Sequence, residues 1–296
     1  MDTDRDVGTI PARFVEVREQ PIGSLGRQIV HAALLRRHCL AAVLVAAVGQ
    51  AGRAAAEGMA AHVDFSSPRM SAAELDRAAV EALIAKGGPV DLADKSLNGL
   101  DLSGLDLGGA DLRWARLNRA RLVGTRLDGA RLDLVWAMEA DLTRASLQRA
   151  SLFQAQLLRA RLDGADLSGA RIAGSFEGAS LVGARLVAAD GEPDMRNQSM
   201  GLMRAVFRSA RLQDADLTDA KLARADLEFA KLQGAVLEGA DLQRALLGGA
   251  NLTGARLAGS NLARADLAST ILLQAAGLDR VVGLDQTLNR NRAFFD

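Results

Sequence analysis

The sequence predicts an all-β fold, a parallel β-solenoid whose chain turns a corner every five residues. Leucine recurs at each fifth position from Leu92 to Leu132 and again from Leu142 to Leu167. A sustained period of five fits neither the α-helical period of about 3.6 residues nor the strand period of about 2. The apolar share of the chain comes from leucine and alanine, with no tyrosine and only 2 tryptophans. This composition argues against an ordinary mixed globular core and favours a repetitive one.

The repeat unit reads small residue, polar residue, leucine and two mostly polar residues. Residues 110–114 (Ala-Asp-Leu-Arg-Trp) and 165–169 (Ala-Asp-Leu-Ser-Gly) are examples. Over roughly residues 92–274 the chain resembles the pentapeptide-repeat family, whose unit is A-(D/N)-L-x-x. The resemblance implies a right-handed quadrilateral parallel β-helix with four pentapeptides in each coil. It also implies that the leucine and the small residue two positions before it point inward.

The predicted core is a stack of leucines with alanines beside the corners. Coils stacked at the strand spacing of about 4.8 Å would add stability coil by coil. At one repeat the volumes are exchanged, because Ala137 takes the leucine position and Val135 takes the small position. We interpret this pair as a repacked coil, with a local bulge as the alternative. The core leucines singled out are Leu102, Leu112, Leu147, Leu167, Leu217 and Leu252.

Two interruptions divide the repeat. The frame slips by one residue between Ile172 and Phe176 and is restored at Leu202, from where it runs to Leu272. Residues 189–199 lack leucine and contain Gly and Pro, so this segment is predicted to leave the coil as a surface loop. The sequence therefore predicts two stacked halves of one rod, whose relative rotational phase it leaves open.

Both ends of the repeat carry segments suited to short helical caps, which cover the open ends of a solenoid. Residues 71–74 (Ser-Ala-Ala-Glu) have the form of a capping box, and the segment after them is amphipathic until Gly and Pro at 87–89 end it. After the last repeat, an apolar tail ends in Phe294 and Phe295. A C-terminal cap is the favoured interpretation, and a homodimer through this segment is the alternative.

These features divide the chain into six predicted segments. They are an N-terminal extension over 1–56 with a candidate signal peptide at about 30–56, a linker and capping helix over 57–89, a first repeat half over 90–188, the loop over 189–199, a second repeat half over 200–275 and a C-terminal cap over 276–296.

The N-terminal extension has the order of regions expected of a cleaved secretory signal. Arg36 and Arg37 precede the apolar run 39–48, and small residues up to Ala56 follow. The run is too short to cross a bilayer as a helix of about 20 residues. Cleavage near Ala56 would remove the only cysteine and send a mature chain to the periplasm or out of the cell. The alternatives are a start near Val30, an amphipathic or disordered tail, and a cytoplasmic protein.

No arrangement for catalysis or metal binding stands out in the repeats. The three histidines, His31, His38 and His62, all precede them. No Ser-His-acid or Cys-His set can be placed on the rod, and its carboxylates alternate with arginines that would neutralise them. We expect no enzyme activity, no cofactor and no metal.

Charge patterning favours neither DNA mimicry nor nucleic-acid binding. Asp101, Arg121, Asp141 and Arg161 follow one another at intervals of twenty residues, so they should stack as an alternating ladder. Residues 97–272 contain 21 acidic and 22 basic residues. A cytoplasmic DNA mimic that modulates DNA gyrase or another topoisomerase, as some pentapeptide-repeat proteins do, would need a strongly negative surface. The arginines do not form one basic stripe, so nucleic acid is a disfavoured partner.

One apolar set at outward positions is the candidate binding site. It consists of Trp114, Leu134 and Phe153 on one face and Trp136, Met138 and Leu158 on the next. A contiguous exposed patch with large aromatic residues commonly marks a partner surface. Cover by Arg116 and Arg131, or by the N-terminal segment, is the alternative. We therefore predict a non-catalytic protein-binding or structural solenoid, exported to the bacterial cell envelope, with an unknown protein partner. A secreted effector is a further alternative.

Overall fold

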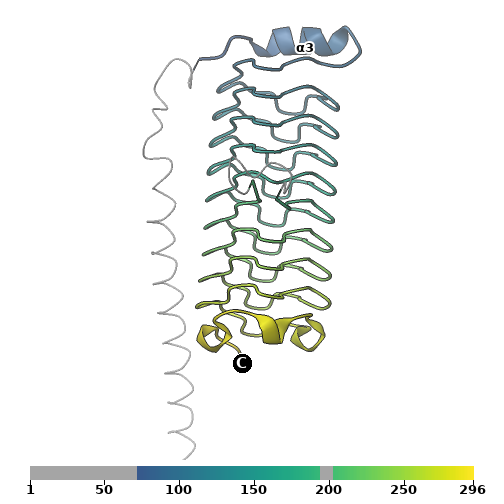
Figure 1. Ribbon diagram of the computed structural model, residues 1–296. Helices are drawn as coiled ribbons and strands as arrows, with labels where there is room; N and C mark the ends of the chain where they lie inside the picture. Colours follow the sequence, from purple (N-terminus) through teal and green to yellow (C-terminus); the bar gives the residue numbers. More distant parts are fainter. Residues whose placement is uncertain (1–71, 194–202) are drawn as a thin grey trace, which may run out of the picture. The chain divides into compact units, whose positions relative to one another are not determined.

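The computed structural model describes residues 72–193 and 203–296, which stack in coils one above another (Figure 1). The described residues fall in the compact unit Val48–Asp296. The predicted signal peptide and the three histidines lie outside the described residues. Across 72–193 and 203–296, no helix combines the length and the apolar character of a membrane span.

Each coil has four sides, and each side pairs with the side above and the side below through a single parallel bridge. We call the sides faces A to D, after their first core residues Leu92, Leu97, Leu102 and Leu107. The partners in a bridge are twenty residues apart wherever the repeat is regular, as in Asp101↔Arg121. Among the described residues these bridges are isolated, and none extends into a strand of several residues. The reason is that the chain turns again before a second pair can form.

Two backbone hydrogen bonds join each side to its neighbours along the stack. The N–H of Leu112 donates to the carbonyl of Arg131 in the next coil at 2.8 Å, and the N–H of Asp111 donates to the carbonyl of Val90 in the previous coil at 2.9 Å. A third bond closes the corner, where the N–H of Ala115 donates to the carbonyl of Leu112 at 3.0 Å. These backbone groups thus find partners without any extended strand.

The core follows the predicted pattern of one central leucine and one small residue on each side. The six leucines singled out from the sequence, Leu102, Leu112, Leu147, Leu167, Leu217 and Leu252, are all at most 1% exposed. Val135 and Ala137 are both buried, and the N–H of Ala137 still donates to the carbonyl of Gln156 at 2.8 Å. The coil is repacked at this point without a bulge, because the bridge of Trp136 keeps the regular spacing.

The one-residue slip is a corner that closes in four residues. Ile172 and Phe176 are both core residues, and Gly174 makes the short corner by donating its N–H to the carbonyl of Ile172 at 2.8 Å. A Cβ atom at Gly174 would lie 2.7 Å from the carbonyl oxygen of Ala155 and 2.9 Å from that of Leu152. Only glycine lets the backbone approach the previous coil so closely.

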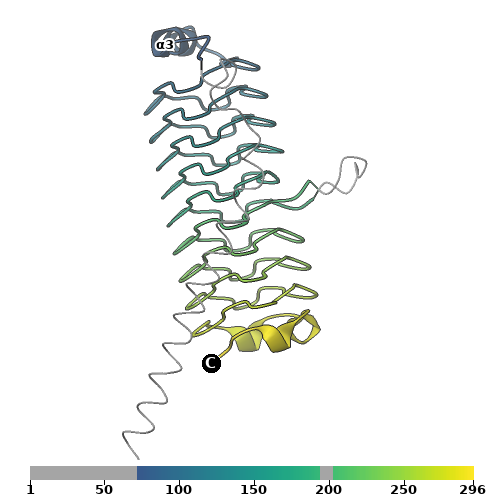
Figure 2. The same cartoon turned by 90° about the vertical axis from the view of Figure 1, so that its left-hand side faces the viewer.

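The surface loop begins later than the sequence predicts. Ala189 is buried and Asp190 pairs with Lys221, so the first residues of the expected 189–199 segment remain in the coil. Gly191 then takes a central position, since its N–H donates to the carbonyl of Lys221 at 2.8 Å. The chain leaves the stack after it (Figure 2) and is back in the core at Ala205.

The loop does not change the rotational phase of the coils. Asp190 pairs with Lys221 and Ser175 pairs with Val206, so each face continues straight past the insertion. The rings of Phe176 and Phe207 stack in successive coils of face B with their centroids 5.0 Å apart. Phe207 shares its coil with Gly191, and a large residue on one side therefore offsets a missing side chain on another.

The N-terminal end of the stack is covered by an edge segment and one helix. The N–H of Glu74 donates to the carbonyl of Ser96 at 2.7 Å. Ser96 belongs to the first coil, so no preceding coil supplies a donor for this carbonyl. Helix α3, Arg77–Ala85, begins after the N-cap Asp76, whose carboxylate accepts the N–H of Ala79. The helix therefore starts later than the predicted capping box, and it buries Val80 against the core.

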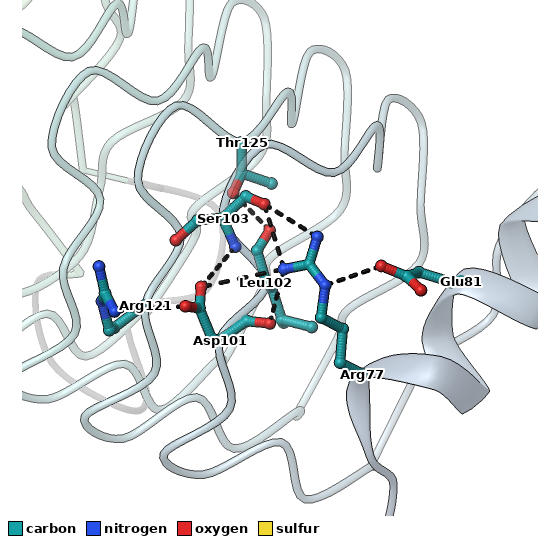
Figure 3. Close-up of polar contacts among 7 residues, drawn as sticks. All are labelled: Arg77, Glu81, Asp101, Leu102, Ser103, Arg121 and Thr125. Carbon is teal, nitrogen blue, oxygen red and sulfur yellow. Dashed lines mark hydrogen bonds and ion pairs between the residues drawn. The ribbon is translucent and has the colours of Figure 1, made fainter.

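One arginine ties α3 to face C. Arg77 donates from Nη1 to the carbonyl oxygens of Asp101 at 3.0 Å and Ser103 at 3.2 Å, and from Nε to Glu81 at 2.7 Å (Figure 3). Hydrogen bonds from Ser103, and then the charges of Arg121 and Arg77, hold the pKa of the Asp101 carboxyl below its ordinary value. The helix is thus attached by polar contacts at its side and by apolar contacts beneath it.

The C-terminal segment makes a last coil with longer sides. Ala276, Val282, Leu288 and Phe294 continue the four ladders at intervals of six residues. Each interval holds one short 3-10 helix: η2 (Leu278–Arg280), η3 (Leu284–Gln286) and η4 (Arg290–Arg292). Val282, Leu288 and Phe294 are exposed on this coil. The predicted homodimer through this segment stays a prediction.

The short corner gives a test of the core geometry. We expect Gly174→Ala to lower the free energy of unfolding by about 2 kcal/mol or more, because the new methyl group overlaps two backbone oxygens of the coil above. Gly183→Ala is the control, since its Cβ would meet nothing within 4 Å and would suffer only from the positive φ of 63°. Urea denaturation of the two variants makes the comparison. Equal losses would contradict the close contact at Gly174.

Candidate functional site

The corner between faces A and B, which we call the A–B edge, carries both tryptophans. Trp114 and Leu134 occupy equivalent left-handed corner positions in successive coils, with φ of 57° and 60°. The N–H of Trp114 donates to the carbonyl of Asp133 at 3.0 Å, so the two corners lie against one another. Trp136 follows on face B. Trp114 and Trp136 are 47% and 41% exposed.

Phe153 extends this apolar surface onto face A, and arginines lie over part of it. The guanidinium carbon of Arg171 is 4.2 Å from the ring centroid of Phe153, and that of Arg113 is 5.6 Å from the ring centroid of Trp114. Such contacts stabilise by about 0.5–1 kcal/mol each at exposed sites. We name Trp114, Leu134, Trp136 and Phe153 the tryptophan patch.

The two arginines expected to cover the patch are held elsewhere. Arg116 pairs with Glu74 at 2.9 Å, and Arg131 pairs with Asp111 at 3.4 Å. Arg113 and Arg171 contact the aromatic rings in their place. Among the described residues, Trp114 and Trp136 therefore keep 47% and 41% of their surface exposed.

Met138 and Leu158 do not belong to the exposed patch. They are only 4% and 7% exposed, although their repeat position is outward. This position is buried along face B from Asn98 to Glu177, and so it forms a closed column. At its start, Asn118 donates its N–H to the side chain of Asn98 at 2.9 Å. The prediction of these two residues as contact residues is wrong for this conformation, since the column encloses them.

Most carboxylates before the central leucines serve the backbone. Asp141 accepts the N–H of Thr143 at 3.1 Å, two residues further on, which satisfies a donor that the ladder bonds leave unused. The same bond is made by Asp91, Asp101, Asp106, Asp111, Asp166, Asp190, Asp216, Asp226, Asp241 and Asp266, and by Asn251 and Asn261. The repeat therefore selects Asp or Asn at this position for structural reasons.

The predicted charge ladders form and are paired. Arg121 lies 3.3 Å from Asp101, and Arg161 lies 3.7 Å from Asp141. At the corner between faces B and C, Glu139 lies 3.0 Å from Arg119 and 3.9 Å from Arg159. Exposed pairs of this kind stabilise by at most about 1 kcal/mol each. Their charges are balanced within the ladder, so they offer little to a partner.

A buried charged cluster lies on face B beside the loop insertion, and the repeat pattern of the sequence does not predict it. Asp226 is buried and receives Arg208 at 2.7 Å and Arg204 at 3.5 Å. Arg208 also pairs with Glu228 at 3.0 Å. Glu177 lies on the same face, one coil before Arg208 and two coils before Asp226, and is 5% exposed. The bridges of Val206 to Ser175 and to Asp226 bring the members together. Because the loop lies between Ser175 and Val206, these two bridge partners are not twenty residues apart in the sequence.

Burial raises the pKa of Glu177, the nearby charge of Arg208 opposes this rise, and that of Asp226 adds to it. The two arginines are engaged by Asp226 and Glu228, which is the arrangement of a structural cluster. Within the described parts of the chain, no group of three or more His, Cys, Asp or Glu side chains is placed to hold a metal ion.

Comparison with known proteins identifies the class of protein that this coil defines. A family model described as pentapeptide repeats matches with 8 copies, over residues 96–133, 140–175, 202–239 and 235–274. The chain belongs to the pentapeptide-repeat family. No curated protein sequence matches it.

Among solved structures, the chain is similar to HetL, a pentapeptide repeat protein involved in heterocyst differentiation regulation from the cyanobacterium Nostoc sp. strain PCC 7120. The identity is 28% and the TM-score 0.52, and the match covers 75% of this chain and 95% of HetL. A trypsin-treated form of QnrB1, a plasmid-mediated fluoroquinolone resistance protein, matches at 15% identity with a TM-score of 0.38, over 71% of this chain and 92% of QnrB1. Rfr23 from the cyanobacterium Cyanothece 51142 matches at 24% identity with a TM-score of 0.23, over 40% of this chain and 87% of Rfr23.

The buried glutamate gives a pH-dependent test of the cluster. A raised pKa means that the folded state prefers the protonated acid, so the stability contributed by Glu177 is present at low pH and is lost as the pH rises through its folded-state pKa. We expect Glu177→Gln to raise the melting temperature at neutral pH by about 2 °C and to have no effect near about pH 4.

Calorimetry over this pH range makes the measurement, with Glu238→Gln as the control. Glu238 pairs with Arg256 at 2.8 Å on the surface, and its replacement should not raise stability at any pH. A gain from Glu177→Gln that does not depend on pH would contradict the assignment.

Proposed function

We propose that the chain is a non-catalytic, right-handed quadrilateral β-helix, covered at both ends, that binds a protein partner through the tryptophan patch. The observation that carries the proposal is the exposure of both tryptophans, 47% and 41%, at adjacent positions of one edge. Tryptophan is among the residues most enriched at the centres of protein interfaces. Large aromatic residues gathered on the surface of a rigid scaffold are typical of a contact site.

The position of the patch supports binding to a preformed surface. Trp114 and Leu134 lie on corners whose backbone is fixed by hydrogen bonds to the next coil, at 3.0 and 2.8 Å. Their backbone therefore loses little conformational entropy on association, which favours affinity. The charge ladders on the other faces are internally paired, and they give no comparable reason for a partner to bind there.

Membership of the pentapeptide-repeat family supports a role in binding and not in catalysis, and the similarity to HetL supports a role in regulation. HetL is described as involved in regulation, and its match spans nearly its whole length at 28% identity. We infer that this chain acts by occupying a surface of another protein. The paired arginines of its ladders do not favour DNA mimicry, since such a mimic depends on a strongly negative surface.

We further propose that the mature protein acts in the periplasm or outside the cell, since residues 30–56 have the order of a secretory signal. A solenoid without cysteine after cleavage suits an oxidising compartment. The partner would then be a component of the cell envelope. A secreted effector would also be exported by this signal, and it would differ only in leaving the cell.

The tryptophan patch can be tested by a double substitution. We expect Trp114→Arg with Trp136→Arg to leave the melting temperature within about 2 °C of the wild type, because both side chains point outward. The same variant should lose photo-crosslinking to the envelope protein that the wild-type patch captures, once that protein has been identified and purified. Phe229→Arg is the control, since Phe229 occupies a left-handed corner on another edge, with φ of 58°. Equal crosslinking by the wild type and the double variant would exclude the patch.

Export can be tested by fractionation of a bacterium that expresses the full chain with a C-terminal tag. We expect a periplasmic product whose N-terminus, read by mass spectrometry, lies near Glu57. Leu44→Arg should keep the protein in the cytoplasm, because a charge interrupts the apolar run that a signal needs. A wild-type product of full length in the cytoplasm would refute the signal.

A further inference from the structure

Three arginines form a second unusual feature on the A–B edge, below the loop insertion. Arg224, Arg244 and Arg264 hold the same left-handed corner position in three successive coils, with φ of 62°, 56° and 60°. The N–H of Arg224 donates to the carbonyl of Gln243 at 2.7 Å, and that of Arg244 donates to the carbonyl of Ala263 at 3.0 Å. The corners are therefore stacked directly, at a coil spacing of about 4.8 Å. We call these three residues the arginine ladder.

The arginine ladder is unfavourable for the fold by itself. A side chain other than glycine in the left-handed region costs about 1 kcal/mol or more at each position. Like charges in adjacent rows also repel one another. Among the described residues, no carboxylate lies within ion-pair distance of any of the three arginines. The equivalent ladder at the corner between faces B and C differs, since Glu139 there separates and neutralises Arg119 and Arg159.

From this arrangement we propose that the arginine ladder binds an extended peptide segment that carries two or three carboxylates on one side. Carboxylates on one side of an extended peptide repeat at about 6.8 Å, and the ladder spans about 9.6 Å between its first and last corners. The long arginine side chains can adjust to this difference, and each guanidinium can bind a carboxylate with two hydrogen bonds.

The narrowness of the ladder favours a peptide over a nucleic acid. On face A the neighbouring column contains Lys221, Asp241 and Asn261, and on face B it contains Asp226, Leu246 and Asp266. Asp226 is buried and paired with Arg208, whereas Asp241 and Asp266 are partly exposed. A wide and densely charged duplex would bring phosphates over these acids, at a cost in repulsion. A single extended peptide can follow the ladder between them.

The arginine ladder is separate from the tryptophan patch, so an experiment can refute the proposal for one site without refuting the proposal for the other. The two lie on the same edge, with Gly191 and the loop insertion between them. Both use arginine or tryptophan, the residue types most enriched in interface hot spots. An acidic segment on the ladder would therefore extend the contact surface of the same edge toward the C-terminal end of the stack.

Binding of a fluorescein-labelled oligoglutamate peptide to the full chain, followed by fluorescence anisotropy at low salt, tests the proposal. We expect the triple variant Arg224→Gln, Arg244→Gln, Arg264→Gln to raise the Kd by about ten-fold or more, since three charge pairs are lost. The control triple is Arg144→Gln, Arg149→Gln, Arg159→Gln, which removes the same charge from left-handed corners of other edges. It should change the Kd by less than about two-fold.

A glycine triple keeps the test independent of folding. Glycine adopts the left-handed corner without strain, so Arg224→Gly, Arg244→Gly, Arg264→Gly should melt at or above the wild-type temperature while losing the same affinity. Equal losses in the ladder and control triples, or no binding by the wild type, would overturn the proposal. Tighter binding of an oligothymidylate, lost only in the ladder triple, would make the ladder a nucleic-acid site and overturn the peptide assignment. None of these variants alters Trp114 or Trp136, so the two sites are tested apart.

Discussion

The structure depends on one constraint, which is that every coil must close in register with the coil above it. Each side has a single bridge and a single central side chain, so no side can shift without breaking its bonds to both neighbours. A register error would move leucine out of the axis and a polar residue into it. The strict spacing of leucine, the small residue two before it and the Asp or Asn between them all follow from this requirement.

Departures from the repeat are tolerated where they preserve that register. Gly174 shortens one corner and Gly191 leaves a core position empty of side chain, yet the bridges on either side continue on the same faces. The ring of Phe207 supplies volume in the coil where Gly191 removes it. The longer sides of the last coil behave in the same way, since the added residues are taken up in 3-10 helices outside the ladder. The fold thus requires a constant register of the bridges along the axis, but it tolerates changes in the length of the corners.

This division explains where binding groups can be placed. Side chains at inward positions form the core, and many Asp side chains before leucine accept hydrogen bonds from backbone N–H groups. The remaining freedom is at corners and on a few outward positions. On the A–B edge these positions hold the exposed tryptophans, the point where the loop leaves the coil, and the arginine ladder. The other edges carry mainly glycine or paired charges, and so the unusual residues of the chain are gathered on one edge of a regular scaffold.

The coil, its core leucines, the repacked pair of Val135 and Ala137 and the alternating charge ladders could all be predicted from the sequence. A five-residue period leaves little choice of fold, and residues twenty apart must then be neighbours. Three features could not be predicted and are known from the fold: Met138 and Leu158 are enclosed, Asp226 pairs with Arg204 and Arg208, and the loop preserves the phase of the coils. These features depend on how a corner closes and which side chains it covers. The spacing of leucine along the chain carries no information about either.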